Sequence, residues 1–82
     1  MPIFEWTSAA RAALRRIELT QARQILDHLN RYAISGRGDV SALSGSTERL
    51  RLRVGNYRVI FRHIEQDKFE VIEVGHRREI YR

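Results

Sequence analysis

The chain has 82 residues, of which 15 are lysine or arginine and 10 are aspartate or glutamate, for a formal net charge of +5 and a pI near 10.7. Because it contains no cysteine, disulfides, thiolate metal sites and thiol nucleophiles are excluded. The length and an apolar content of 43% predict one small globular domain, residues 1–82, with a thin core. The positive charge indicates a polyanionic partner, which could be nucleic acid, an acidic protein or an anionic membrane surface.

The first residues, MPIFEW, lack the basic segment and the long apolar run of a secretory signal. No later segment approaches the roughly 18 apolar residues of a membrane-spanning helix. We therefore expect a soluble protein that stays in the cytoplasm and has no membrane partner.

The first half of the chain indicates a strand followed by two helices. Residues 3–6 (IFEW) form a short apolar-rich run, and Thr7 or Ser8 could cap a helix through AARAALRRI. Thr20 offers a second N-cap, followed by apolar residues at helical spacing that end near Gly36. These apolar residues are Ala22, Ile25, Leu26, Leu29 and Ala33. The short ELT link predicts that the two helices form a helical hairpin.

The second half indicates strands. Residues 35–48 contain three glycines and four serines and predict a loop, which Val40 and Leu43 anchor to the core. Apolar residues then alternate with arginines through RLRLRV, Gly55-Asn56 supplies a two-residue turn of type II′, and the strands YRVIFRHIE and FEVIEV follow. The predicted fold is α+β, in the order β-α-α-β-β-β. Its helical hairpin covers one face of a small, twisted, mainly antiparallel sheet.

The hairpin carries like charges opposite one another. A turn centred on Gly55-Asn56 places Arg53 opposite Arg58 and Arg49 opposite Arg62. Each pair should cost a fraction of a kcal/mol, since favourable cross-strand pairs contribute about 0.2–1 kcal/mol. The structural interpretation is a solvated basic face that Glu70 or Glu73 on the next strand neutralises. That interpretation suits any single arginine better than it suits the whole cluster.

The cluster favours phosphate recognition. Several arginines can converge on the concave side of the sheet, and arginine, unlike lysine, makes bidentate contacts with phosphate. They are Arg49, Arg51, Arg53, Arg58, Arg77 and Arg78. The tail GHRREIYR adds His76 and Tyr81 as candidates for proton transfer, because neighbouring guanidinium groups favour the phenolate form of a tyrosine. An aromatic residue in such a tail can also serve only as a packing anchor.

The sequence contains no acidic cluster suited to Mg²⁺, no paired histidines at zinc spacing and no glycine-rich loop leading into a helix. It therefore predicts neither a metal nor a cofactor. The chemistry that remains is metal-free cleavage of RNA, in which the 2′-hydroxyl attacks its own phosphate, arginines stabilise the developing charge and Tyr81 or His76 moves protons.

Two segments, DVSALSGSTERLRLRVGNYRVIF and VGHRREIYR, resemble the RelE branch of the RelE/ParE toxin superfamily. The resemblance implies the toxin of a type II toxin–antitoxin pair. It further implies a ribosome-dependent mRNA endonuclease that cleaves in the A site and inhibits translation until a cognate acidic antitoxin binds. Operator DNA would then be bound only through the antitoxin, since no helix in this chain resembles a recognition helix.

The same resemblance implies roles for individual residues. Arg49 and Arg51 match the family's basic pair for RNA binding, and Arg53, His76 and Arg78 are supporting contacts to the RNA or the ribosome. The catalytic residues implied are Arg58, Arg77 and Tyr81. In the family pattern, the tyrosine is the general base and the arginines stabilise the phosphorane and help to protonate the leaving group.

Two alternatives remain open. A ParE-like toxin of the same fold would poison DNA gyrase through protein contact, without any need for Arg58, Arg77 and Tyr81 together. A nucleic-acid-binding module without activity would explain the charge but not the terminal tyrosine.

Overall fold

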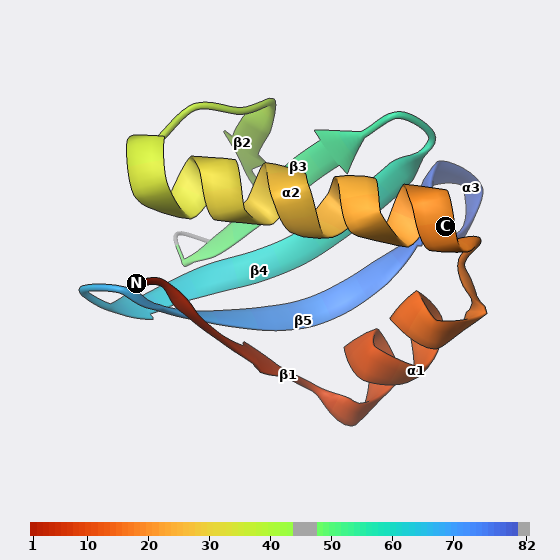
Figure 1. The fold of residues 1–82 in the computed structure, drawn as a ribbon, viewed down its shortest axis with the longest axis horizontal. Coiled ribbons are helices and arrows are strands. Elements are labelled where there is room, and N and C mark those ends of the chain that lie inside the picture. The colour runs from red at the N-terminus through yellow and green to blue at the C-terminus, as the bar shows by residue number, and fades with distance from the viewer. Residues whose placement is uncertain (44–47, 81–82) are drawn as a thin grey trace.

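The computed structural model describes residues 1–43 and 48–80, and these ranges contain five strands and three helices (Figure 1). The elements are β1 (Ile3–Trp6), α1 (Ser8–Arg16), α2 (Leu19–Ser35), β2 (Val40–Ala42), β3 (Arg49–Val54), β4 (Tyr57–Glu65), β5 (Lys68–His76) and α3 (Arg77–Ile80). The strands form one sheet in the order β1-β5-β4-β3-β2, with β1 parallel to β5 and the other neighbours antiparallel. The predicted α+β fold is confirmed, with β2 and α3 as additional elements.

The residues predicted to form a loop, 35–48, include the short edge strand β2. Val40 pairs with Leu52, Ser41 with Arg51 and Ala42 with Leu50. A strand of three residues is too short to display an alternating pattern, so only its pairing with β3 defines it. Val40 packs against the core, as predicted for an anchor of this segment, and residues 44–47 lie outside the described residues.

The helix ends are set by local hydrogen bonds. Thr7 is the N-cap of α1, and its Oγ1 accepts from the backbone N–H of Ala10 at 3.0 Å. The cap of α2 is Glu18 rather than the predicted Thr20: its carboxylate accepts from the N–H of Gln21, and hydrogen bonding from the Thr20 backbone lowers the pKa of Glu18. The helix ends at Gly36 as predicted, because this residue adopts the left-handed conformation, with φ of +75°.

The core lies between the sheet and the helices α1 and α2. Its fully buried large side chains are Phe61, Ile25, Leu29, Leu52, Val59 and Val71. Leu26, expected on the buried face of α2, is 42% exposed. No helix in the described part of the chain is long and apolar enough to cross a membrane.

The β3–β4 hairpin has the predicted register, with Val54 opposite Tyr57, Arg53 opposite Arg58 and Arg49 opposite Arg62. In the turn, Gly55 has a φ of +58°, as the first central position of a type II′ turn requires, and Asn56 has no positive φ. Because side chains alternate along a strand and Leu52 and Val54 are buried in the core, the arginines of β3 face away from α1 and α2.

The capping of α1 can be tested by substitution. We expect Thr7→Ala to lower the free energy of unfolding by about 1–2 kcal/mol, because Thr7 caps the helix and its hydroxyl also donates to the Ile72 carbonyl at 2.7 Å. Urea denaturation measures the change. Thr7→Ser should retain most of the stability, and Ser8→Ala should change it by less than about 0.5 kcal/mol. An equal loss in Ser8→Ala would show that the cap is assigned to the wrong residue.

Candidate functional site

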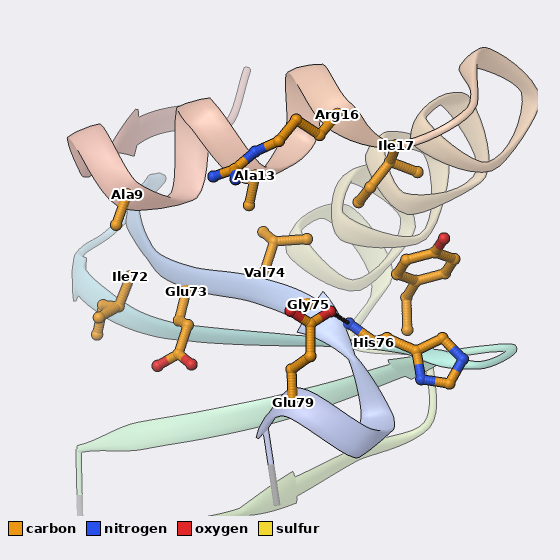
Figure 2. A pocket seen from close by; sticks show the side chains of 11 residues that line it. Ala9, Ala13, Arg16, Ile17, Ile72, Glu73, Val74, Gly75, His76 and Glu79 are labelled. Carbon is orange, nitrogen blue, oxygen red and sulfur yellow. Dashed lines mark hydrogen bonds between the residues drawn. The ribbon is translucent and has the colours of Figure 1, made fainter. Parts of the chain in front are cut away.

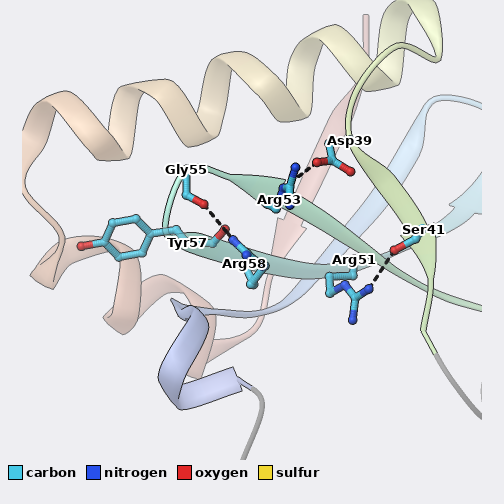
Figure 3. A network of polar contacts seen from close by, with 7 residues as sticks. All are labelled: Asp39, Ser41, Arg51, Arg53, Gly55, Tyr57 and Arg58. Atoms are coloured by element: carbon cyan, nitrogen blue, oxygen red, sulfur yellow. Dashed lines mark hydrogen bonds and ion pairs between the residues drawn. The ribbon is translucent and has the colours of Figure 1, made fainter.

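A row of arginines on β3 forms the first part of the site. Arg49, Arg51 and Arg53 share the sheet face opposite α1 and α2. Two of these arginines contact residues in or next to β2. Arg51 donates to Ser41 Oγ at 3.1 Å, and Arg53 forms an ion pair with Asp39 at 2.6 Å (Figure 3). The Arg53–Asp39 pair is solvent-exposed, with 62% and 57% of the two side chains accessible, so a phosphate can compete for Arg53.

Neighbouring groups offset the repulsion between the paired arginines of the hairpin. Arg62, opposite Arg49, donates from Nε to Glu70 Oε1 at 2.8 Å, as expected for a carboxylate on the next strand. This hydrogen bond and the attraction between the charges raise the pKa of Arg62 above its usual value. Arg62 therefore forms a structural ion pair with Glu70 beside the site.

Arg58 is placed differently from the other predicted site residues. It lies opposite Arg53 in the register, but its side chain is buried, with 6% exposed. Its Nη1 donates to the carbonyl oxygens of Gly55 and Tyr57, both at 2.9 Å (Figure 3). The alternation of the strand predicted which face Arg58 lies on, but it gave no sign that the guanidinium folds back to the turn.

Helix α3 packs on the same face of the sheet as the arginines. Ile80 of α3 approaches Gly75, where an added Cβ would lie 3.3 Å from Ile80 Cδ1, and Gly75 is the register partner of Arg58. Since paired residues share a face, α3 lies on the side of the sheet opposite α1 (Figure 2). The backbone N–H of Arg77 donates to the Asn56 carbonyl at 2.8 Å, which brings Arg77 to the same turn as Arg58.

The first turn of α3 is held by reciprocal hydrogen bonds. Figure 2 shows Glu79 Oε1 accepting from the N–H of His76 at 3.3 Å. His76 Nδ1 in turn accepts from the N–H of Arg78 at 3.2 Å. The side chains of Arg77 and Arg78 are exposed. The structure thus assembles the β3 arginines, Arg58 and the start of α3 around one face. Tyr81, the predicted general base, lies outside the described residues.

A cavity of about 690 Å³ adjoins the start of α3, between α1 and β5 (Figure 2). Its lining residues are Ala9, Ala13, Arg16, Ile17, Tyr57, Ile72, Glu73, Val74, Gly75, His76 and Glu79. The ring of Tyr57 meets the His76 ring edge-on, with centroids 5.8 Å apart. Two of the lining residues, Ala9 and Ala13, are small and lie one helical turn apart on α1.

No group of three or more histidine, cysteine, aspartate or glutamate side chains in residues 1–43 and 48–80 is placed to hold a metal ion. The chemical resources of the described site are guanidinium groups, an imidazole and backbone amides. Such groups bind anions and stabilise developing negative charge.

Comparisons with known proteins agree with the fold. The chain resembles the isolated RelE toxin of E. coli with a TM-score of 0.78 and 20% identity, over 93% of this chain and 84% of that one. It resembles the RelB–RelE antitoxin–toxin complex of Methanococcus jannaschii with a TM-score of 0.75 and 21% identity, over 94% of both chains. For the DinJ–YafQ complex of E. coli, the TM-score is 0.69 at 8% identity over the full length of both chains.

At these identities the solved structures establish the fold. No curated protein matches the chain significantly. The family model for the ParE toxin of the type II toxin–antitoxin system parDE matches residues 4–81, almost the whole chain. The chain therefore belongs to the ParE toxin family, within the RelE/ParE superfamily of type II toxin–antitoxin toxins.

Proposed function

We propose that this toxin is a metal-independent endoribonuclease that cleaves mRNA in the ribosomal A site and so inhibits translation in the cytoplasm. The observation that carries the proposal is the convergence of the β3 arginines and α3 on one face of the sheet. An RNA backbone supplies the anion for this face and, through its 2′-hydroxyl, the nucleophile. DNA lacks that internal nucleophile, so the reaction is specific for RNA.

The β3 arginines bind the RNA backbone in this proposal. Alternate residues on a strand lie about 7 Å apart, so Arg49, Arg51 and Arg53 present successive guanidinium groups along an extended chain. Arg51 and Arg53 are held from one side by Ser41 and Asp39, which limits the rotamer freedom that binding must remove. Arg78 and His76 provide supporting contacts at the start of α3.

Arg77 and Tyr81 carry the chemistry. Arg77 is exposed and anchored by its backbone, and its guanidinium stabilises the charge that develops on the phosphorane. Tyr81 takes the proton of the 2′-hydroxyl as the general base. The Arg58 guanidinium is turned to the hairpin carbonyls, so we assign the phosphorane contact to Arg77.

A cognate antitoxin completes the proposal. Solved structures of this fold include toxins bound to their antitoxins. An acidic antitoxin that neutralises the arginine face would keep the toxin silent and would associate rapidly through electrostatic steering. Contact with operator DNA would then belong to the antitoxin.

The family model supports a second candidate. It describes the ParE toxin, which makes poisoning of DNA gyrase by protein contact the alternative function for this fold. Poisoning requires a gyrase-binding surface but no proton transfer at the tail. The two functions therefore differ in what Arg77 and Tyr81 must do.

Mapping transcript 5′ ends after brief induction separates the two functions. We expect cuts at fixed codon positions with the wild type and a loss of about 100-fold or more with Arg77→Ala, the usual cost of removing a group that stabilises transition-state charge. Arg31→Ala is the matched control, because Arg31 is an exposed arginine of α2, on the other side of the sheet, and should leave the cuts unchanged. Intact transcripts together with DNA breaks would refute the nuclease in favour of gyrase poisoning.

The tyrosine has its own test. Tyr81→Phe keeps the ring and removes the phenol, so cleavage should fall by about 100-fold or more, the scale of general base catalysis. Tyr32→Phe makes the same change in a tyrosine that packs on Phe61 in the core, and it should cleave like the wild type. Unchanged cleavage by Tyr81→Phe would show that His76 or the ribosome, and not Tyr81, takes the proton.

A further inference from the structure

We propose that the cavity beside the start of α3 is a nucleobase-binding site, which receives one base of the RNA whose phosphates lie on the arginine face. The inference rests on the proposed function for the identity of its ligand, and it adds a site that recognises the sequence of the RNA. The preferred occupants are the bases with an exocyclic amino group, namely adenine, cytosine and guanine, over uracil.

The cavity exists because β5 extends beyond its neighbour β1. The pairing of β1 with β5 ends at Trp6 and Val71, whereas β5 continues to His76. From this point α1 lies beside β5 in place of a strand, and the small side chains of Ala9 and Ala13 leave a gap between them. The opening of about 690 Å³ falls within the range of small-ligand sites, about 300–1,000 Å³, and accommodates a planar base.

The cavity adjoins the face that carries the arginines. Glu73 lines it and is the register partner of Ile60, which in turn pairs with Arg51, so Glu73 and Arg51 share one face of the sheet. Figure 2 shows the Glu73 carboxylate on the α3 side of β5. His76, also in the lining, directly precedes Arg77, to which the phosphorane contact is assigned. A nucleotide whose phosphate contacts Arg77 can therefore place its base in the cavity.

Glu73 is the group that selects the base. Glu70, on the same strand, is neutralised by Arg62, but Glu73 is exposed and takes part in none of the ion pairs formed among residues 1–43 and 48–80. A carboxylate on a phosphate-binding face repels the RNA backbone, so a favourable role requires contact with another part of the nucleotide. An ionised carboxylate only accepts hydrogen bonds, and exocyclic amino groups donate them. Uracil offers one N–H between two carbonyl oxygens, which a carboxylate repels.

The rings of Tyr57 and His76 provide a stacking surface. They meet edge-on, with centroids 5.8 Å apart, and both residues are half-buried. In an edge-on pair the rings do not cover each other face to face, so a ring face remains for a base. Single-stranded RNA is recognised by aromatic stacking combined with hydrogen bonds to the edge of the base. The cavity supplies both kinds of contact next to the arginines that bind phosphate.

NMR titration of the full-length toxin with 2′-O-methylated trinucleotides tests the site without cleavage, because the methyl group blocks the nucleophile. The adenine and cytosine trimers should shift the amide signals of Val74, Gly75 and His76. The uracil trimer should bind about fivefold more weakly, the lower end of discrimination by a specific base contact. An abasic trimer, which carries the phosphates alone, should shift signals of β3 but not those of the cavity. Cavity signals that respond equally to the abasic and adenine trimers, or to neither, would overturn the proposal.

Glu73→Gln tests the selecting group. A glutamine amide both donates and accepts, so the preference for adenine and cytosine over uracil should disappear. Removal of a negative charge strengthens the binding of any polyanion, and the readout is therefore the ratio of affinities between trimers. Glu65→Gln is the matched control, because it makes the same change in an exposed carboxylate at the other end of β4 from Tyr57, and it should keep the wild-type ratio. An unchanged ratio in Glu73→Gln would refute the role of Glu73.

Tyr57→Leu tests the stacking surface. It should weaken the binding of the adenine trimer about fivefold or more, the scale of one base stacked on an aromatic side chain, whereas Tyr57→Phe should bind like the wild type. Tyr57 also packs against the core, so the amides of Phe61 and Val71 report whether each variant is folded. If Tyr57→Leu does not fold, Glu73→Gln still decides the proposal.

Mapping of transcript 5′ ends adds a readout that depends on the proposed function. The wild type should cut less often where uracil occupies one fixed codon position, and Glu73→Gln should lose that bias. Cuts by the wild type that show no such bias at any position would overturn the proposal. If the wild type does not cleave, the proposed nuclease function fails, while the trimer titration still decides whether the cavity binds a base.

Discussion

The pairing register of β3 and β4 is the constraint on which the rest of this structure depends. It places Leu50, Leu52 and Val54 against the helices and the intervening arginines on the open face. Because side chains alternate along a strand, a slip of one residue would bury the arginines and expose the leucines. The type II′ turn at Gly55-Asn56 excludes that slip, so the same turn that specifies the core also specifies the charged surface.

The register brings like charges together, and the surroundings limit the cost. Arg53 turns to Asp39, Arg58 to two backbone carbonyls and Arg62 to Glu70. A like-charged cross-strand pair costs on the order of 0.2–1 kcal/mol, a tolerable part of the roughly 5–15 kcal/mol that stabilises a domain. The arginines themselves differ in burial. Arg53 is exposed and accessible to a ligand, whereas Arg58 is buried against the hairpin.

Much of the fold could be predicted because it is encoded locally. The hairpin register followed from the alternation of leucine and arginine about one glycine, and the end of α2 followed from Gly36. The strand β2 and the exposure of Leu26 could not be predicted, since both depend on packing between distant segments. For the site, the sequence indicated which residues share a face. It could not indicate that the Arg58 guanidinium folds back to the hairpin turn, because the carbonyls that receive it are backbone atoms present at every position.

The two candidate functions, mRNA cleavage and gyrase poisoning, place different demands on the same surface. A protein that only binds gyrase needs shape and charge, which the β3 row and the sheet can supply without α3. Cleavage needs groups held to fractions of an ångström, since small misplacements are costly in rate. In this chain the start of α3 is tied by the Asn56 carbonyl, by reciprocal bonds between His76, Arg78 and Glu79, and by Ile80 against Gly75. These contacts stabilise a helix too short to persist on its own and also fix where its first residue lies, which is the placement that the proposed cleavage would require.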